Sequence, residues 1–420
     1  MLGWEFPPMI NGGLGVACLG IAKELAKKVD LTLIVPKSSL KFKIENLNLI
    51  GLNNQRVADC IAMDELQLEV FDNLYFIDSE LNPYAEVNEK DNSDIREKLF
   101  NRTETIVEEG NIFEGNDLYG SSLNKMVVEF THCVLALAEK MSFDIIYAHD
   151  WMTFVAGMEL KKRSGKPLIL HVHSLSYDRL GQESKGWVYA IEKLAMKAAD
   201  AIIPVSRYTG RICTQYYEVD FKKIFPVHNG VDTFKILKVN KQFEEKVVLF
   251  LGRVTTQKGP SAFIEIASKV FEENKNVRFV IAGAGDQLEG LVKLGVNSEL
   301  KKRVHFTGFL DREKVNTLLA MTDVYCMPSV SEPFGLSALE AAQFGIPTVL
   351  TKQSGAAEVL KGALKADYWD VNLMSMHVLA LLSDGELRKE VIETSYLDIQ
   401  KLTWNSSVKK IIDVFDQQRS

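Results

Sequence analysis

The sequence predicts an α/β protein built from two doubly wound parallel sheets. Short apolar runs of strand length alternate with amphipathic helical stretches along most of the 420 residues, a pattern typical of parallel sheets that helices cover on both faces. The alternation occurs in two blocks, and at roughly 100–200 residues per domain the length also indicates more than one domain.

The predicted strands are short apolar runs with helical patterns between them. Residues 16–28 and 123–141 are two such helical patterns, and the second carries Met and aromatic side chains at helical spacing, which we interpret as core. The predicted strands are Leu31–Val35, Ile145–Ala148, Leu168–Val172, Ala201–Val205, Val247–Leu251, Val277–Ala282, Val324–Met327 and Thr348–Leu350.

The two blocks are predicted to be separate domains. The first covers residues 1–232 and includes a less regular elaboration over residues 41–116. Residues 232–245 are polar and lack periodicity, as a linker does, and the second domain covers residues 246–395. Only Met1–Trp4 precedes the first turn, so we expect a very short first strand.

Composition excludes several classes of protein. The hydrophobic fraction of 46% and the charged fraction of 25% are those of an ordinary globular chain. With 49 basic against 56 acidic residues the formal charge is −7, so no nucleic-acid partner is expected. No apolar run approaches the roughly 18 residues of a membrane span, and no signal peptide is recognisable at the start. We therefore expect a cytoplasmic protein without integral membrane segments.

Cysteine usage indicates a reducing compartment. The five cysteines are odd in number, widely spread and free of any C-x-x-C pair, so neither a disulfide framework nor a zinc knuckle is predicted. Their apolar neighbours suggest buried thiols. They are Cys18, Cys60, Cys133, Cys213 and Cys326.

Three features of the first block could carry chemistry. Gly12-Gly13-Leu14-Gly15 opens a helix and would let a ligand approach the backbone, although a simple tight turn is the alternative. Asp150 follows a predicted strand, where parallel sheets bind ligands, and a helix N-cap is its alternative role. His171 and His173 share one face of a strand. A metal pair, a structural pair and substrate contact by His173 all remain open. A metal would need further His, Asp or Glu ligands, and we expect no bound metal.

The second block has a cationic loop after a strand. Arg253 and Lys258 lie five residues apart in LGRVTTQKGP, and two cations on one loop suit a diphosphate. Surface ion pairs are the alternative, and no P-loop is present. After the next strand, Gly283 and Gly285 form a strand-to-helix turn that we expect near the ligand.

A pair of glutamates separated by seven residues is the most informative feature. Glu332 precedes Pro333-Phe334-Gly335-Leu336, where a helix is predicted to start near Gly335. The free N–H groups of a helix start suit a phosphate. Glu332 can accept hydrogen bonds from a sugar's hydroxyl groups. Glu340, inside the helix, can reach ribose hydroxyls, as acids do in nucleotide sites.

Together these residues resemble the retaining glycosyltransferases of family four. The resemblance spans nearly the whole chain and rests on EPFGLSALEA and LGR-x4-KG, with AHDW, LHVHSLSYDR, PVSRYT, VHNGVD and VHFTGFL resembling glycogen synthase-like bacterial and archaeal members. It implies the GT-B fold, α/β with two Rossmann-like domains facing a central cleft. It also implies that residues 396–420 cross back to the first domain, with a helix over residues 406–418.

The resemblance assigns roles to the candidate residues. Arg253 and Lys258 would hold the donor diphosphate, and Glu332 the donor sugar. Glu340 would hold the ribose. His173 and Asp150 would lie near the reacting sugar, with Glu332, as the catalytic residues. The remaining donor contacts would be Gly13, Gly283, Phe309, Phe334, Gly335 and Leu336.

The implied reaction is retaining transfer of a sugar, expected to be glucose, to a glucan or another glycan acceptor. The donor would be UDP-glucose or ADP-glucose, without a further cofactor, and the absence of Asp-x-Asp agrees with a metal-independent site. Ile10-Asn11 precedes Gly12-Gly13 where ADP-glucose-using synthases often carry Lys-x-Gly-Gly, which leaves the donor base open. A GT-B nucleotide-sugar epimerase and a non-catalytic sugar-nucleotide-binding relative are the alternatives. A dinucleotide oxidoreductase lacks its glycine fingerprint, and a metal hydrolase would rest on two histidines.

Overall fold

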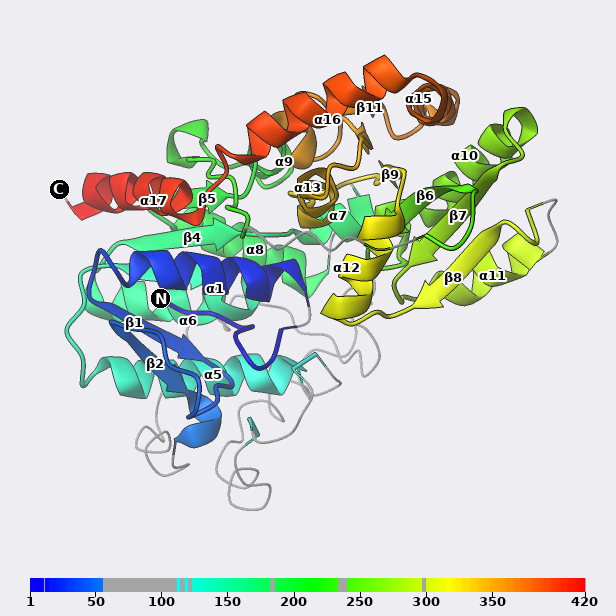
Figure 1. Ribbon diagram of the computed structural model, residues 1–420. Helices are drawn as coiled ribbons and strands as arrows, with labels where there is room; N and C mark the ends of the chain where they lie inside the picture. The colour runs from blue at the N-terminus through cyan, green and yellow to red at the C-terminus, as the bar shows by residue number, and fades with distance from the viewer. Residues whose placement is uncertain are drawn as a thin grey trace. The chain divides into compact units, whose positions relative to one another are not determined.

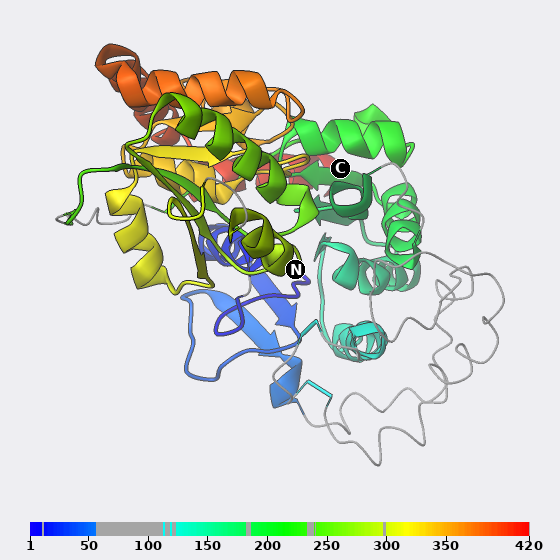
Figure 2. The same ribbon diagram turned by 90° about the vertical axis from the view of Figure 1, so that its right-hand side faces the viewer.

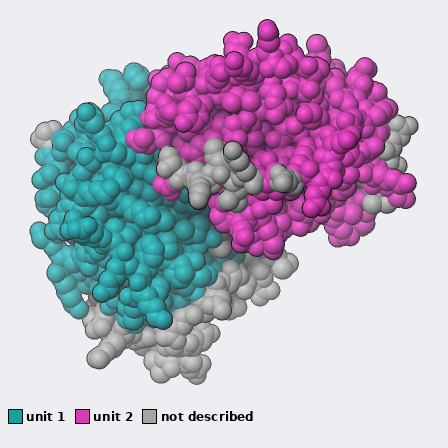
Figure 3. Space-filling view, in the orientation of Figure 1, with its two compact units in different colours: residues 1–205, 209–230, 404–420 teal, residues 206–208, 231–403 magenta. Residues whose placement is uncertain are grey.

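The computed structural model describes residues 1–10, 12–55, 112–113, 118–119, 123–181, 186–232, 239, 241–296 and 300–419. The chain divides into two compact units, coloured separately in Figure 3. The first comprises residues 1–205, 209–230 and 404–420, and the second comprises residues 206–208 and 231–403. Most of the predicted elaboration over residues 41–116, and part of the predicted linker, lie outside the described residues.

The first unit contains a parallel sheet whose centre is the very start of the chain. Leu2 forms parallel bridges with Ile34 on one side and Ala148 on the other. The order across the sheet is therefore β2, β1, the Leu2 segment, β3, β4 and β5. Numbered along the chain this is 3-2-1-4-5-6, the doubly wound order, with its switch point between Leu2 and β3. The strands are β1 (Leu31–Val35), β2 (Leu47–Gly51), β3 (Ile146–His149), β4 (Leu168–Val172) and β5 (Ala201–Pro204).

Two helices from opposite ends of the sequence pack together in the first unit (Figure 1). Gly20 of α1 faces the ring of Trp404 in α17 so closely that a Cβ atom at Gly20 would lie 2.2 Å from the ring atom Cε2. Val408 and Ile411 continue the buried stripe of α17. The helices of this part of the chain are α1 (Gly13–Leu25), α5 (Leu123–Ala138), α6 (Trp151–Ser164), α7 (Ser176–Leu180), α8 (Trp187–Ala198), α9 (Arg207–Tyr216) and α17 (Trp404–Arg419), with short 3₁₀ turns at η1 (Leu52–Asn54) and η4 (Phe221–Lys223).

Replacing Trp404 should destabilise the first unit strongly. Its indole is buried against Gly20, so Trp404→Ala removes a large apolar side chain and leaves a cavity, at a cost of roughly 3–5 kcal/mol in unfolding free energy. Denaturant unfolding measures this cost, with Tyr396→Ala as the control because Tyr396 is half exposed. Equal losses in the two variants would contradict the packing role of α17.

The second unit contains a six-stranded parallel sheet in the order β11-β10-β9-β6-β7-β8. Along the chain this is again the doubly wound order, and its switch point lies between β6 and β9. Helices pack against this sheet, as Figures 1 and 2 show. The strands are β6 (Lys246–Leu251), β7 (Val277–Ala282), β8 (Val304–Gly308), β9 (Val324–Met327), β10 (Thr348–Thr351) and β11 (Leu364–Ala366). The helices are η5 (Thr256–Lys258), α10 (Pro260–Glu273), α11 (Leu288–Val296), α12 (Arg312–Met321), α13 (Leu336–Gln343), α14 (Ala356–Val359), α15 (Val371–Ser383) and α16 (Gly385–Ile399).

Every predicted strand is present, within one or two residues at its ends. Three strands that the apolar runs did not predict, β2, β8 and β11, lie at sheet edges. Edge strands expose some of their residues to water, so they lack the continuous apolar run of a central strand. Cys18, Cys133, Cys213 and Cys326 are buried free thiols, as predicted, and Cys60 lies outside the described residues. Among the described residues, no helix combines the length and apolarity that crossing a membrane requires.

Candidate functional site

In the second unit, the loops after β6 and β9 meet at the switch point of the sheet. Lys258 ends the short helix η5 after β6, and its ammonium forms an ion pair with the carboxylate of Glu332, which follows β9. Both side chains are largely buried. The second predicted cation, Arg253, leaves the end of β6 and is exposed. The structure therefore places a buried ammonium–carboxylate pair and an exposed guanidinium where a doubly wound sheet binds its ligand.

Gln257 ties the two loops together and so holds Lys258 in place. Its side-chain amide donates to the main-chain carbonyl of Ser331 at 3.0 Å, and its main-chain carbonyl accepts from the amide of Val330 at 2.9 Å. Two hydrogen bonds, one from the side chain of Gln257 and one to its main chain, therefore connect the loops that carry Lys258 and Glu332.

The main chain of Glu332 is anchored on both sides. Its amide donates to the carbonyl of Gln353 at 2.9 Å, and its carbonyl accepts from the amide of Gly355 at 3.0 Å. Phe334 is buried directly beyond it, and Gly335, with φ of 97°, caps α13, which starts at Leu336. The predicted helix start is confirmed, and it lies next to Glu332, because a Cβ atom at Gly335 would lie 3.2 Å from Cγ of Glu332.

Glu340 makes an ion pair that the sequence did not predict. Its carboxylate accepts from a terminal nitrogen of the Arg312 guanidinium, on α12, at 2.7 Å. Arg312 is half exposed at this contact, so hydroxyl groups of a ligand can compete for the same carboxylate. The two residues are separated by 28 positions, and no local pattern in the sequence pairs them.

Gly283 is packed against backbone rather than left open. It has φ of 142°, its amide donates to the carbonyl of Gly308 at 3.0 Å, and a Cβ atom there would lie 1.9 Å from the carbonyl oxygen of Gly252. Gly283 therefore holds the loops after β6, β7 and β8 together next to Arg253. Phe309, directly after β8, is 82% exposed, so its ring offers a flat apolar face to a ligand.

In the first unit, Asp150 fastens the loop that follows β4. Its Oδ1 accepts from the amide of His173 at 2.7 Å and from that of Ser174 at 3.4 Å. Asp150 occupies the predicted N-cap position of α6, but its side chain makes no cap hydrogen bond to that helix. Burial raises the pKa of Asp150 well above its usual range, against the opposing effect of these two amides. Its φ of 58° is strained for a residue other than glycine, and such strain clusters at functional sites.

Three histidines stack at the ends of β3 and β4. The rings of His171 and His173 lie 4.2 Å apart at an angle of 6°, as their predicted common face requires. The Nδ1 atom of His149 lies 2.9 Å from Nε2 of His173. Burial lowers the pKa of His173 to about 3 and those of His149 and His171 well below their usual range, so all three rings are neutral at pH 7.

Glu192 of α8 is a buried carboxylate that the sequence analysis missed. It accepts from the amide of Ser176 at 3.0 Å, from the Ser176 hydroxyl at 2.5 Å and from the Tyr217 hydroxyl at 2.6 Å. Ser176 lies three residues after His173 and begins α7. Glu192 therefore fixes the second half of the HSLSYDR loop, while Asp150 fixes the first half.

Glu192 should make the stability of the first unit depend on pH. Burial raises its pKa from 4.5 to about 7, so the native state holds this proton more tightly than the unfolded chain does. Unfolding free energy therefore falls as the pH rises from 4.5 to 7, by about 3 kcal/mol for this group. Glu192→Gln removes that contribution. Urea unfolding of both proteins across this pH range should give a difference that shifts by about 3 kcal/mol, and parallel profiles would contradict the assignment.

Glu5 was also missed, although it directly follows the Leu2 segment at the switch point. It is buried, its Oε2 accepts from the amide of Gly15 at 3.2 Å, and the Tyr119 hydroxyl donates to its Oε1. Glu5 thus anchors the glycine loop, whose Gly13 is exposed in the first turn of α1. An acid between a short strand and a glycine loop was the signal that could have found it.

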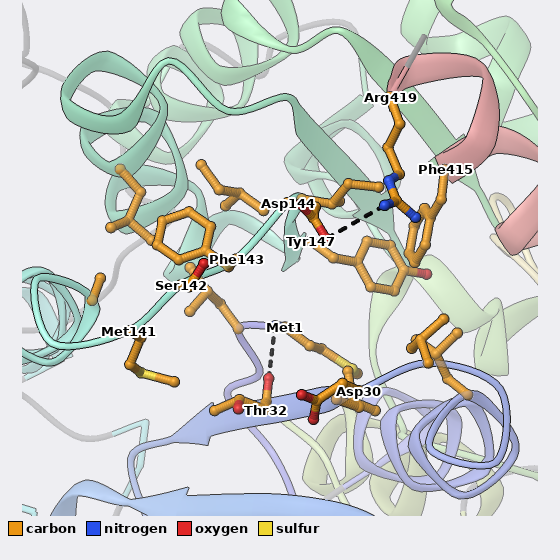
Figure 4. A pocket seen from close by; sticks show the side chains of 18 of the residues that line it. Met1, Asp30, Thr32, Met141, Ser142, Phe143, Asp144, Tyr147, Phe415 and Arg419 are labelled. Atoms are coloured by element: carbon orange, nitrogen blue, oxygen red, sulfur yellow. Dashed lines mark hydrogen bonds and ion pairs between the residues drawn. The ribbon is translucent and has the colours of Figure 1, made fainter.

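A cavity of about 250 Å³ lies at the opposite edge of the first sheet, by the amino ends of β1 and β3 (Figure 4). The amine of Met1 donates to the carbonyl of Thr32 at 2.9 Å, and Arg419 of α17 pairs with Asp144 at 3.5 Å. Ligands of parallel sheets bind at the carboxyl ends of the strands, so this cavity is not part of the candidate site.

Two doubly wound units, each with buried polar groups at its switch point, define an α/β protein of the two-domain, Rossmann-like class. The family model described as glycosyl transferases group 1 matches residues 232–398, and the model described as glycosyltransferase family 4 matches residues 97–235. Together they span well over half of the chain. The chain is a glycosyltransferase of the family-four type, with the GT-B fold.

Relatives at modest identity agree with this assignment. An uncharacterised glycosyltransferase of Methanocaldococcus jannaschii is 25% identical, over 99% of this chain and 97% of its own length. An uncharacterised glycosyltransferase of Bacillus subtilis is 29% identical over 65% of this chain and 77% of its own. A glycogen synthase of Mycobacterium tuberculosis is 26% identical over 52% of this chain and 54% of its own.

Solved structures show the same fold. The sucrose-phosphate synthase of Thermosynechococcus elongatus matches with a TM-score of 0.67 at 18% identity, over 99% of this chain and 95% of that one. The Anabaena protein HepE, in complex with UDP and glucose, matches with a TM-score of 0.64 at 14% identity, over 99% and 98% of the two chains.

Proposed function

We propose that this glycosyltransferase moves glucose from UDP-glucose or ADP-glucose to a glucan or a related glycan acceptor, with retention of anomeric configuration. The observation that carries the proposal is the ion pair between Lys258 and Glu332 at the switch point of the second unit. An ammonium suits a diphosphate, and a carboxylate beside it suits the hydroxyl groups of the attached sugar.

The chemistry needs stabilisation of a leaving diphosphate. Charge develops on that group as the bond to the sugar breaks. Lys258, which its ion pair holds in place, the N–H groups at the start of α13 and the exposed guanidinium of Arg253 are the proposed donors to it. The exposed ring of Phe309 is offered to the base. When the donor binds, the carboxylate of Glu340 releases Arg312 and accepts hydrogen bonds from the ribose hydroxyls.

The first unit contributes uncharged groups in this proposal. The anomeric carbon becomes positive in the transition state, and a protonated imidazole beside it would oppose that charge. Burial keeps His173 neutral at pH 7, and Asp150 holds its main chain in place. Both residues therefore suit a position next to the reacting sugar.

One relative's name gives a nucleotide-sugar donor, because an Escherichia coli galactosyltransferase is named for UDP-Gal. Two others are named a glycogen synthase and a D-inositol 3-phosphate glycosyltransferase, so the named acceptors or products differ. A carboxylate such as Glu332 can accept from neighbouring hydroxyls and discriminates against deoxy sugars that lack them, though not between glucose and its epimer galactose. The preference for glucose comes from the glycogen synthase-like motifs.

Transfer should survive removal of divalent metal ions. The proposed donor site stabilises the diphosphate with cationic side chains and helix N–H groups, and the chain contains no Asp-x-Asp tripeptide. Rates measured with and without EDTA should agree within a factor of about two. Abolition by EDTA, with rescue by Mg²⁺ or Mn²⁺, would contradict the proposed donor site.

A thermal-shift screen tests donor binding directly, because a ligand that binds only the native state raises its apparent stability. UDP-glucose or ADP-glucose should raise the melting temperature more than other sugar nucleotides do. Glu340→Ala should reduce that shift, whereas Glu313→Ala, on the neighbouring helix α12, should not. Selective stabilisation by a different sugar nucleotide would overturn glucose, and binding without turnover would indicate a non-catalytic relative.

A further inference from the structure

The histidine stack of the first unit is completed by a thiol from another element. Sγ of Cys18, in α1, lies 3.5 Å from Nδ1 of His149, which in turn lies 2.9 Å from Nε2 of His173. All three ligand-type atoms lie within 4.8 Å of one another. The sequence indicated His171 and His173 as a possible metal pair without further ligands. The structure instead brings His173 together with Cys18 and His149.

These spacings are close to those of a bound transition metal. Zinc binds nitrogen at about 2.0–2.1 Å and thiolate sulfur at about 2.3 Å, which puts tetrahedral ligand atoms about 3.4–3.6 Å apart. The Cys18–His149 distance already has this value. The His149–His173 distance must lengthen by about 0.5 Å, and the Cys18–His173 distance, which is at most 4.8 Å, must shorten by about 1.3 Å or less. Thiolate with two imidazoles is a donor set that favours Zn²⁺ and similar cations over Mg²⁺.

Hydrogen bonding leaves this cluster incompletely satisfied. Nδ1 of His149 has one proton or one lone pair, so it can serve only one of its two neighbours fully. Nε2 of the same ring is buried without a partner. A cation can bind Nδ1 of His149 only in the tautomer that carries its proton on Nε2. Since Nε2 has no hydrogen-bond partner, no bond there opposes that tautomer.

We propose that Cys18, His149 and His173 form an inhibitory site for Zn²⁺ or a cation of similar softness. Binding joins the cation to one sulfur and two nitrogens and releases the thiol proton of Cys18 to solvent. The inhibitory part rests on the proposed function, because a bound cation engages the ring of His173, which that proposal puts next to the reacting sugar. The binding part stands on this cluster alone.

Cobalt titration of the full chain, after treatment with a chelator, tests binding without any assay of transfer. One equivalent of Co²⁺ should produce the near-ultraviolet absorption of a cobalt–thiolate bond, and Zn²⁺ should displace it. Cys18→Ser should abolish the band and weaken binding at least about tenfold, since even altered ligand support costs about 10–100-fold. Cys133→Ser, at a buried thiol of α5 in the same unit, is the matched control and should keep both.

The outcomes separate the two parts of the proposal. Equal cobalt binding by Cys18→Ser and wild type, or no thiolate band in the wild type, would overturn the site. His149→Gln, which keeps Cys18, should also lose affinity, and it decides the matter if Cys18→Ser fails to fold. One equivalent of Zn²⁺ should remove most of the transfer activity of the wild type and spare Cys18→Ser. Thiolate-bound Zn²⁺ without inhibition would overturn the inhibitory role and leave the proposed function intact.

Discussion

Lys258→Ala should lower the rate of sugar transfer by roughly 100–1000-fold while the protein stays folded. Its ammonium lies at the switch point of the second sheet, paired with Glu332, and loss of one preorganised donor to a developing oxyanion costs about this much. The variant also leaves the buried carboxylate of Glu332 without its cation. Arg253→Ala should cause a loss of similar size, because its exposed guanidinium is the second proposed contact of the diphosphate.

Steady-state kinetics with the preferred donor measures these losses. Lys269→Ala removes an exposed lysine from α10 in the same unit and should keep the wild-type rate. Lys258→Arg keeps the charge but changes its shape, so it should recover only part of the rate. Near-wild-type turnover by both Lys258→Ala and Arg253→Ala would refute the assignment of the diphosphate to this loop.

Gly283→Ala should destabilise the second unit and abolish transfer. A Cβ atom there would lie 1.9 Å from the carbonyl oxygen of Gly252, and the φ of 142° is itself unfavourable for alanine. Overpacking and backbone strain each cost roughly 1–3 kcal/mol, which gives about 2–6 kcal/mol of unfolding free energy. The loop after β6 must also shift, and it carries Arg253.

Gly290→Ala is the matched control for this substitution. Gly290 lies in α11 of the same unit, and a Cβ atom there would meet nothing within 4 Å. Alanine favours a helix interior over glycine, so this variant should be as stable as the wild type or slightly more stable. Denaturant midpoints compare the two, and equal stability of Gly283→Ala and Gly290→Ala would show that the loop does not need glycine.

Local pattern was enough to predict the central strands and the start of α13. A central strand of a parallel sheet is apolar on both faces, so β4 and β7 stand out in the sequence with their correct bounds. The edge strand β8 does not, because its residues alternate between buried and more exposed positions. Gly335 before an amphipathic stretch likewise marks the helix start, since only local geometry is involved.

The pairings within the site could not be predicted in this way. Lys258 and Glu332 are separated by 74 residues, and the parallel order of β6 next to β9 is what brings them together. Glu192 reads as an ordinary polar position of an amphipathic helix until Ser176 and Tyr217 are seen to surround it. Contacts that depend on strand order, or that join three separate elements, have no characteristic spacing in the sequence and so cannot be predicted from it.

Asp150 shows what local pattern leaves open about a side chain. A short acidic residue ahead of a helix has the pattern of an N-cap, and Asp150 does stand at the N-cap position of α6. Its carboxylate, however, accepts from the amides of His173 and Ser174 instead of capping the helix. Those amides follow the neighbouring strand β4, which lies beyond the local sequence.

Transfer of glucose with retention can be followed in the products of the reaction. The protein is incubated with UDP-glucose or ADP-glucose and a maltooligosaccharide, and the products are followed by mass spectrometry and by proton NMR of the new anomeric centre. We expect longer chains, one free nucleoside diphosphate per added glucose and an α-linkage in the product. Consumption of a different sugar nucleotide alone would contradict glucose and leave the transferase, whereas a β-linked product from the α-linked donor would contradict the retaining reaction itself.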